Sequence, residues 1–168
     1  MLVTLMALEI ERKFLVVSDD WRVQVERSAD YRQAYLAHNG LVSVRIRIAG
    51  DKANINLKSA GLEIQRDEFE YAIPIDDARQ LLHLCSGAVI DKTRHFVRHE
   101  RHLWEIDVFA GANAGLIIAE IELDSAEESF DRPQWLGIEV SGDPRYYNVY
   151  LADHPYAEWS VKPDPAST

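Results

Sequence analysis

Glu9, Glu11 and Lys13 occupy every second position of the segment LEIERKFLV, residues 8–16. Alternate side chains of an extended strand share one face, so two carboxylates and one ammonium would point the same way. Carboxylate oxygens are the ligands that hard divalent cations prefer, and an ammonium can pair with phosphate or with those carboxylates. The spacing therefore predicts a strand with one face suited to ionic chemistry.

The same alternation recurs in six further segments of the chain. In SVRIRI, for example, Arg45 and Arg47 alternate with apolar residues, and in DEFEY Glu68 and Glu70 alternate with aromatic ones. Taken together, the charged faces carry both signs, with Glu9, Glu11, Glu68, Glu70, Glu105, Asp107, Glu120 and Glu122 against Lys13, Arg45, Arg47, Lys58, Arg66, Lys92 and Arg94.

For any single strand, a polar face in contact with solvent explains such a pattern. Seven strands with mixed charge on one face and apolar residues on the other favour a different arrangement, in which the charged faces point into a barrel. Buried charges need partners, water or an ion. Clustered cations suit a small polyanion, and Arg binds phosphate oxygens through a bidentate fork. Clustered carboxylates suit Mg²⁺, so the combination indicates metal-assisted phosphoryl chemistry.

The elements that would position these residues are mainly strands. Period-2 patterns separated by turn sequences predict strands at 8–16, 32–37, 42–49, 53–59, 66–74, 92–99, 102–109 and 116–123. Short helices are expected in DDARQLLHLC, with Asp76 or Asp77 as N-cap, in DSAEESF and in DPRYYNVYLA. Because the strands are mostly sequential, we expect a mainly β (α+β) domain built on an antiparallel sheet or barrel with a few flanking helices.

Composition limits the class of protein further. The 168 residues suit one domain, and a formal net charge of −10 argues against a nucleic-acid partner. One cysteine excludes an internal disulfide and fits a reducing compartment. The opening MLVTLM is too short for a membrane span and lacks the basic start of a signal peptide. We therefore expect a cytoplasmic protein with no membrane partner.

The segment EIERK resembles the ExExK signature of the CYTH superfamily, the triphosphate tunnel metalloenzymes. RQAYL, RIRI, NLKS, RDEFEYAI, DKTRH, WEIDVFAG, AEIEL and IEVSGDPRYYN follow in the order and spacing of that family. The resemblance covers about residues 7–152 and is greatest to short bacterial members. It implies an eight-stranded antiparallel closed barrel, a tunnel open at both ends. Residues 1–6 and the end of the Pro-rich tail, 163–168, are expected to be flexible ends. The resemblance also implies Mg²⁺ or Mn²⁺ as cofactor.

The resemblance assigns roles to residues of this sequence. Substrate binding falls to Arg45, Arg47, Lys58, Lys92, Arg94 and Lys13, and metal binding to Glu9, Glu11, Glu68, Glu70, Asp107, Glu120 and Glu122. Glu9, Glu11, Lys13, Tyr35 and Lys58 are the catalytic candidates. Lys13 would either support the ExExK carboxylates or touch phosphate. Tyr35 would be either a catalytic group or a hydrogen-bond donor in the lumen, since a phenol with a pKa of about 10 is a poor base.

The expected reaction is metal-dependent hydrolysis of a triphosphate, with inorganic tripolyphosphate giving pyrophosphate and phosphate as the leading case. A nucleoside triphosphatase, a thiamine triphosphatase or a class IV-type adenylate cyclase would use the same fold. A non-catalytic module that binds polyphosphate or nucleotide belongs to another class. The many carboxylates argue against that module, because a pure binder of polyanions has no need of them. The sequence leaves monomer and homodimer both open.

Overall fold

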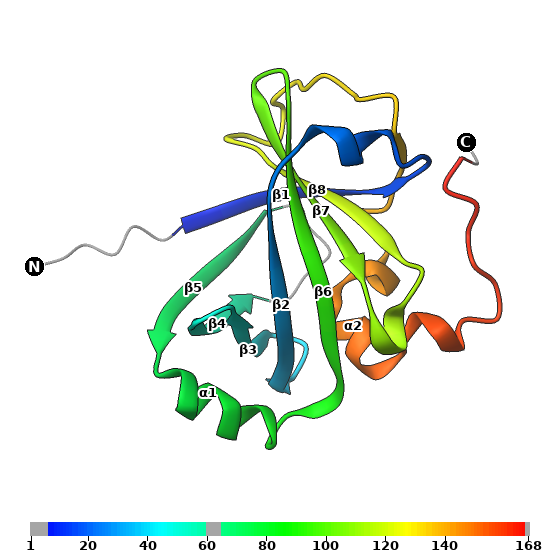
Figure 1. Ribbon diagram of the computed structural model, residues 1–168. Coiled ribbons are helices and arrows are strands. Elements are labelled where there is room, and N and C mark those ends of the chain that lie inside the picture. The colour runs from blue at the N-terminus through cyan, green and yellow to red at the C-terminus, as the bar shows by residue number, and fades with distance from the viewer. Residues whose placement is uncertain (1–6, 60–64, 167–168) are drawn as a thin grey trace, which may run out of the picture.

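The computed structural model describes residues 7–59 and 65–166, including every side chain in those ranges except residues 7–9, 65 and 66. Nine strands in these ranges form a single antiparallel sheet (Figure 1). The strands are β1 (Ala7–Val16), β2 (Val25–His38), β3 (Val42–Ala49), β4 (Lys52–Ser59), β5 (Gln65–Ile73), β6 (Ser86–His99), β7 (His102–Phe109), β8 (Ile117–Glu122) and β9 (Leu136–Glu139). All eight predicted strands are confirmed, although β2 and β6 are longer than expected, and β9 was not predicted.

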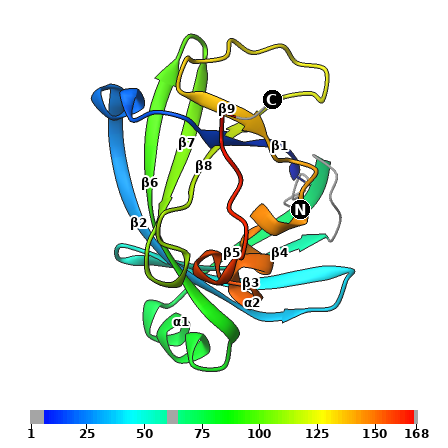
Figure 2. The ribbon, with the colours of Figure 1, turned by 90° about the vertical axis from the view of Figure 1, so that its right-hand side faces the viewer.

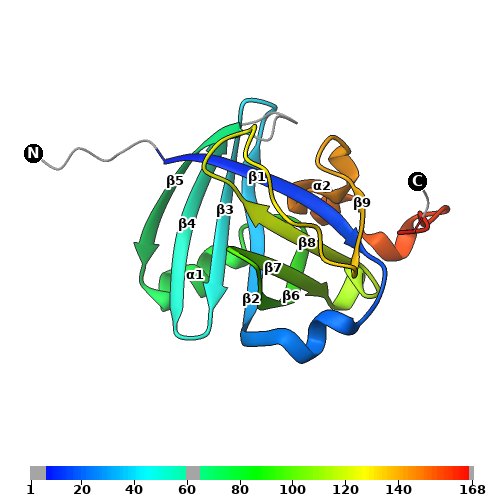
Figure 3. The same cartoon turned by 90° about the horizontal axis from the view of Figure 1, so that it is seen from above.

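The sheet curls until its two ends meet at β1 (Figure 3). Its order is β5-β4-β3-β2-β6-β7-β8-β1-β9, and β5 also pairs with β1. This seam is short, running from Ala7↔Glu68 to Ile10↔Gln65. Farther along, β1 pairs with β9 through Phe14↔Glu139 and Val16↔Leu136. The predicted eight-stranded barrel is therefore joined along the first half of β1, and beyond that half the described part of β1 lies against β9 instead of β5.

The helical elements are short. They comprise α1 (Ile75–Leu82), α2 (Asn148–Asp153) and the 3₁₀ turns η1 (Asp20–Gln24), η2 (Gly111–Asn113), η3 (Pro144–Tyr146) and η4 (Tyr156–Glu158). Among the described residues, no helix is long and apolar enough to cross a membrane.

All three helix predictions need correction. The helix α1 begins after Pro74 rather than after an aspartate cap, and the predicted helix in DPRYYNVYLA is split into η3 and α2. The predicted helix in DSAEESF is wrong, because the segment is a turn. Its Glu128 carboxylate accepts a hydrogen bond from Asp124 N at 2.7 Å and lies 2.9 Å from His102 Nε2, so both of its oxygens hold non-helical contacts.

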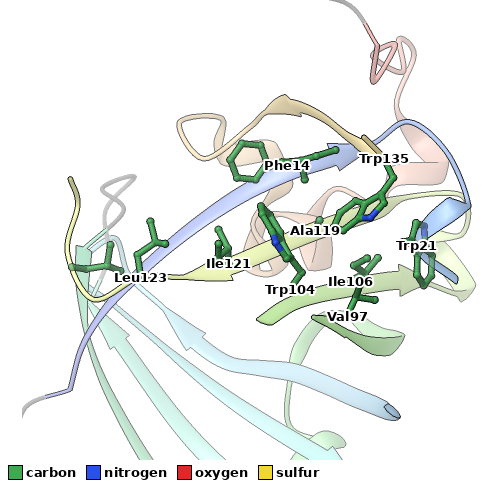
Figure 4. Packing of buried hydrophobic residues seen from close by; sticks show 11 residues of the cluster. Phe14, Trp21, Val97, Trp104, Ile106, Ala119, Ile121, Leu123 and Trp135 are labelled. Atoms are coloured by element: carbon green, nitrogen blue, oxygen red, sulfur yellow. The ribbon is translucent and has the colours of Figure 1, made fainter. Parts of the chain in front are cut away.

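A large aromatic core lies on the outer face of β1, β7 and β8 (Figure 4). Phe14, Trp21 and Trp104 are fully buried, and Trp104 packs edge-to-face on Trp135 with ring centres 5.6 Å apart. The residues of this core alternate with the charged residues along each strand. Because burying large aromatic surfaces is strongly favourable in water, this core fixes which strand face points outward. The charged face is then left to point inward.

The inward faces become apolar near the C-terminal segment. Leu15, Phe109 and Ile118 join a second buried cluster with Tyr146 of η3 and Leu151 of α2. Figure 2 shows α2 beside the strands, while the chain after it runs back past β9. A third, smaller cluster lies beneath α1. Helical segments and the inward apolar residues thus enclose a charged middle section of the barrel.

Candidate functional site

The charged middle section contains a cavity of about 530 Å³. Residues from all eight barrel strands, β1–β8, and from the start of α2 line it. They are Glu11, Lys13, Tyr31, Tyr35, Ser43, Arg45, Arg47, Lys58, Glu68, Phe69, Glu70, Tyr71, Arg94, Glu105, Glu120, Glu122, Tyr147, Asn148 and Val149. The described lining therefore brings together five basic and six acidic side chains from strands far apart in the sequence.

One wall of the cavity consists of cross-strand rows on β2, β3, β4 and β5. Strand register places Gln33 opposite Arg47 and Asn54, Tyr35 opposite Arg45, Asn56 and Glu70, and Ser43 opposite Lys58 and Glu68. Successive rows are about 6.7 Å apart, because each is two residues farther along a strand. Each row carries one cation, so Arg47, Arg45 and Lys58 form a ladder of positive charge along the wall.

Asn56 and Glu68 link the middle of this ladder. The buried amide of Asn56 donates to Glu68, and its nitrogen lies 3.4 Å from Glu70 Oε2. Glu68 also forms an ion pair with Lys58 at 3.3 Å and a longer one with Arg45 at 3.8 Å. The Nε and Nη2 atoms of Arg45 are buried and find no hydrogen-bond partner among the described residues. Arg45 thus lines the cavity and keeps donor capacity that no described residue uses.

The opposite wall, on β1, β7 and β8, has its charges closely paired. The Lys13 ammonium contacts the carboxylates of Glu11 and Glu120. Burial alone would lower the pKa of Lys13, but these two carboxylates outweigh it and raise the pKa well above its ordinary value. Burial likewise would raise the pKa of Glu120, but Lys13 and Arg94 hold that pKa well below its usual range. Both groups are therefore charged at neutral pH.

Arg94 is enclosed by three carboxylates. Its Nε and Nη2 atoms donate to the two oxygens of Asp107, each at 2.7 Å, and Nη2 also donates to Glu120 Oε2 at 2.5 Å. Glu105 contacts the same guanidinium. Asp107 is fully buried and also contacts Lys92. Burial lowers the pKa of Lys92 to about 8, against the attraction of Asp107.

The cavity cations and the buried tyrosine influence one another. Burial, with repulsion from Arg45 and Arg94, lowers the pKa of Arg47 to about 10. Burial raises the pKa of Tyr35, although Arg45 and Arg47 oppose the shift. The Tyr35 hydroxyl is therefore protonated at neutral pH, and in this state it is a hydrogen-bond donor rather than a base.

The donor chemistry of the acidic wall fits a hard divalent cation. Glu11, Glu105, Glu120 and Glu122 offer only carboxylate oxygens, which Mg²⁺ and Mn²⁺ prefer. Two of these carboxylates already converge on a single cation, the Lys13 ammonium. Within the described residues, no three acidic, His or Cys side chains are gathered closely enough to hold a metal. A metal held by Glu11 and Glu120 would therefore compete with the Lys13 ammonium for their oxygens.

Most of the predicted site residues face this one cavity. Glu11, Lys13, Tyr35, Arg45, Arg47, Lys58, Glu68, Glu70, Arg94, Glu120 and Glu122 line it. Lys92 and Asp107 lie behind Arg94 and are not among the lining residues, so Asp107 presents no oxygen to the cavity without losing Arg94 or Lys92. The side chain of Glu9 lies outside the described residues, although strand pairing places Glu9 opposite Arg66.

Several lining residues gave no signal in the sequence. Ser43 and Asn148 are neutral, and Tyr31 and Phe69 are ordinary strand residues. Asn56 also belongs to the site through its contacts with Glu68 and Glu70. Once the strand pairing is known, Ser43 and Asn56 are recognised as site residues because they lie opposite Lys58 and Arg45. Tyr147, Asn148 and Val149 come from the start of α2, which no strand pattern could connect to the cavity.

Fold and cavity together define a β-barrel protein with an internal, highly charged binding site. The chain belongs to the CYTH domain family, whose model matches residues 7–147. It is 42% identical over 152 residues to an inorganic triphosphatase of Acetivibrio thermocellus, covering 90% of this chain and 97% of that protein. An inorganic triphosphatase of Nitrosomonas europaea is 35% identical over 149 residues, with 86% and 96% covered.

A solved structure supports the same relationship. The crystal structure of an inorganic triphosphatase superposes with a TM-score of 0.64 at 33% sequence identity, covering 86% of this chain and 93% of that one. The fold and family predicted from the sequence are thereby confirmed.

Proposed function

We propose that this protein hydrolyses inorganic tripolyphosphate to pyrophosphate and phosphate with the help of a divalent cation. The observation that carries the proposal is the ladder of Arg47, Arg45 and Lys58, which faces carboxylates across a single cavity. The names of the two relatives, both inorganic triphosphatases that align over nearly their whole length, support the choice of substrate. A simple polyanion binder would not explain the acidic wall.

In this proposal the two walls divide the work. Arg45, Arg47 and Lys58 align the phosphate chain and neutralise its charge as the transition state forms. Glu11, Glu120 and Glu122 would hold the cation, together with Glu9 as the sequence predicts, and a bound cation would supply Lewis-acid chemistry at the phosphoryl oxygens. Lys92 and Asp107 fix the guanidinium of Arg94 from behind, so Arg94 can meet the substrate in one orientation.

The reaction exchanges one P–O bond for another. The oxygen of a water molecule forms a bond to the terminal phosphorus, and the bridging P–O bond breaks to release pyrophosphate. The proton lost by the water passes to a carboxylate of the acidic wall, which acts as general base. Tyr35, whose hydroxyl keeps its proton, donates a hydrogen bond to a phosphoryl oxygen.

A second candidate substrate class is favoured by the aromatic residues at the cavity. Tyr31 lines it on the same face of β2 as Tyr35, so a nucleobase or a thiazole ring has an aromatic surface on which to stack. Nucleoside and thiamine triphosphates therefore belong in the same assay.

Phosphate release should be measured from tripolyphosphate, ATP and thiamine triphosphate in parallel, each with Mg²⁺, Mn²⁺ or EDTA. We expect release from tripolyphosphate that needs a metal and exceeds release from the other two. Greater release from ATP or thiamine triphosphate would move the assignment to that substrate. Conversion of ATP to cyclic AMP would indicate a cyclase, and tight binding without turnover would indicate a binding module.

A further inference from the structure

Gln33 lies in the middle of β2 and is completely buried. It shares the inward face of that strand with Tyr31 and Tyr35, which line the cavity on either side of it. Strand register places it opposite Arg47 on β3. Gln33 is not itself among the lining residues, but it lies next to Arg47 at the end of the cation ladder.

The contact with Arg47 decides how the amide is oriented. Arg47 Nε lies 3.3 Å from Gln33 Oε1. A guanidinium has only N–H donors, so the amide must turn its carbonyl oxygen toward Arg47. The amide NH₂ group is consequently directed away from this guanidinium. Its nitrogen, Nε2, is buried and has no hydrogen-bond partner among the described residues.

A buried donor without an acceptor is unfavourable, and buried polar groups in proteins are rarely left in that state. The neighbouring amide of Asn56 illustrates the usual outcome, because its NH₂ group meets Glu68 and Glu70. Gln33 has no such carboxylate, and the guanidinium beside it attracts anions. An anionic oxygen bound by Arg47 would give the Gln33 amide the acceptor that it lacks.

We propose that Gln33 is a further substrate-binding residue, which positions Arg47 through its carbonyl oxygen and donates its NH₂ group to a phosphoryl oxygen. This inference rests on the proposed function for the identity of the ligand. Gln33 would add an uncharged donor to the cation ladder. Because one amide would contact both the guanidinium and the substrate, it would fix where the phosphoryl oxygen lies relative to Arg47.

The direct test follows the side-chain amide signals of the full-length wild-type protein by ¹H,¹⁵N NMR. The protein is titrated with tripolyphosphate in EDTA and, separately, with pyrophosphate and Mg²⁺. The Gln33 signals are assigned in the wild-type protein by triple-resonance experiments that connect each side-chain amide to its own backbone. Asn113 provides a matched control, because its Oδ1 is also occupied and its nitrogen is also buried and unpartnered. Neither amide is among the cavity-lining residues, but Gln33 meets the lining residue Arg47, whereas Asn113 meets Tyr156 N at 2.8 Å.

We expect the Gln33 amide protons to move downfield on titration while the Asn113 signals stay in place. If the Gln33 signals do not move in either titration, the inference is overturned. This readout needs only the wild-type fold, so it decides the question even if a substitution at this buried position prevents folding.

Steady-state kinetics of Gln33→Met give an independent readout. Loss of one hydrogen bond to a charged ligand should raise KM for tripolyphosphate by about tenfold, with a smaller change in kcat. A lower melting temperature with unchanged KM would show a purely structural role and contradict the inference. If wild type fails to hydrolyse tripolyphosphate but its Gln33 signals still move, the proposed reaction is wrong and the binding role of Gln33 stands.

Discussion

Arg45 and Arg94 lie in the same cavity, yet their charges are neutralised differently. Arg94 donates to Asp107 and Glu120 and contacts Glu105, so its donors are largely used within the protein. Arg45 has an ion pair at 3.8 Å and two buried nitrogen atoms without hydrogen bonds. The difference indicates that Arg45 has more donor capacity to offer a ligand than Arg94, whose orientation is fixed by its carboxylate partners.

Arg45→Ala should therefore lower kcat/KM for tripolyphosphate by about 10²- to 10³-fold, the usual effect of removing one donor that meets developing charge. Arg32→Ala is the matched control, because Arg32 lies on neighbouring β2 and its side chain is 61% exposed. That variant should retain activity within about twofold, as expected for a surface substitution. An unchanged kcat/KM in Arg45→Ala would mean that the β3 wall does not bind substrate.

Lys92 gives a prediction about pH. Burial lowers the pKa of Lys92 to about 8 in the folded protein, from an ordinary value of 10.5. Between these two pH values the unfolded chain binds more protons than the folded chain, so the contribution of Lys92 to the free energy of unfolding rises with pH. Below pH 8 both states hold the proton and the contribution is constant.

Denaturant unfolding of wild type and Lys92→Met at pH 7 and pH 10 tests this. Relative to the variant, wild type should gain stability on the order of 2–3 kcal/mol between these pH values. Taking the difference between the two proteins removes the contributions of groups that they share. Parallel stability curves would show that Lys92 titrates normally and is not held in a dry environment.

The charged faces of the strands could be predicted at this scale because they follow a period of two. The pairing of Asp107 with Arg94 and Lys92 could not, since it depends on the register of β6 against β7. Gln33 and Asn56 share a strand face with Tyr35 and Lys58 by alternation, but no role in the site could be predicted for either. Neutral amides leave no charge pattern, and they join the site only because strand register places them beside Arg47 and Glu70.

Among the secondary-structure elements, β9 and the residues after it hold β1 in place from the side away from β8. Lys13 N donates to Ser141 Oγ, and Val140 N donates to Lys13 O, both at 2.9 Å. Arg12, on the outward face of β1, pairs with Glu139. The backbone of Lys13 is thus fixed from one side while its ammonium meets Glu11 and Glu120 on the other. This explains how a strand that leaves β5 halfway along still places its charges accurately.

A substitution at Gly137 tests how closely β9 approaches β1. A Cβ atom there would lie 2.5 Å from Pro165 O, 2.9 Å from Val17 Cγ1 and 3.0 Å from Leu15 O. Two of these neighbours are backbone atoms that cannot turn aside. Gly137→Ala should therefore lower the free energy of unfolding by about 1–3 kcal/mol, a typical cost of overpacking.

Gly142→Ala serves as the control, since no described atom lies within 4 Å of the corresponding Cβ. Its stability should stay within about 0.5 kcal/mol of wild type. Thermal or denaturant unfolding of both variants gives the comparison. Equal stability of the two variants would mean that β9 is not packed tightly between β1 and the C-terminal segment.

The strands were predictable because alternation reports directly on a sheet with two unlike faces. The short strand β9 was missed, since LGIE offers only four residues and little alternation. DSAEESF has a helix-start sequence, but tertiary contacts decide its structure, as the Glu128 carboxylate meets His102 and Asp124 N. A local capping signal therefore fails to predict a helix where the capping side chain, here that of Glu128, bonds to a residue distant in the sequence.

For the molecule as a whole, the barrel fold encloses many charged side chains in its interior. The protein carries a net charge of −10, yet the described cavity lining holds five basic side chains beside six acidic ones. Aromatic residues on the outer face, such as Trp104 and Trp135, turn the charged faces inward, and mutual pairing makes their burial tolerable. The sequence could predict this inversion of polarity, but not the short β1–β5 seam, which depends on how far the two strands stay in contact.

The measurement that tests this account most directly is phosphate release from tripolyphosphate by wild type and Glu120→Gln across a titration of Mg²⁺ or Mn²⁺. Glu122→Gln, at an exposed neighbouring position, is run alongside in case the buried substitution impairs folding. We predict metal-dependent release by wild type and a fall in kcat of at least about 100-fold in the folded variants. Near-normal turnover in both variants, or wild-type activity that persists in EDTA, would contradict the claim that these carboxylates bring metal and triphosphate together.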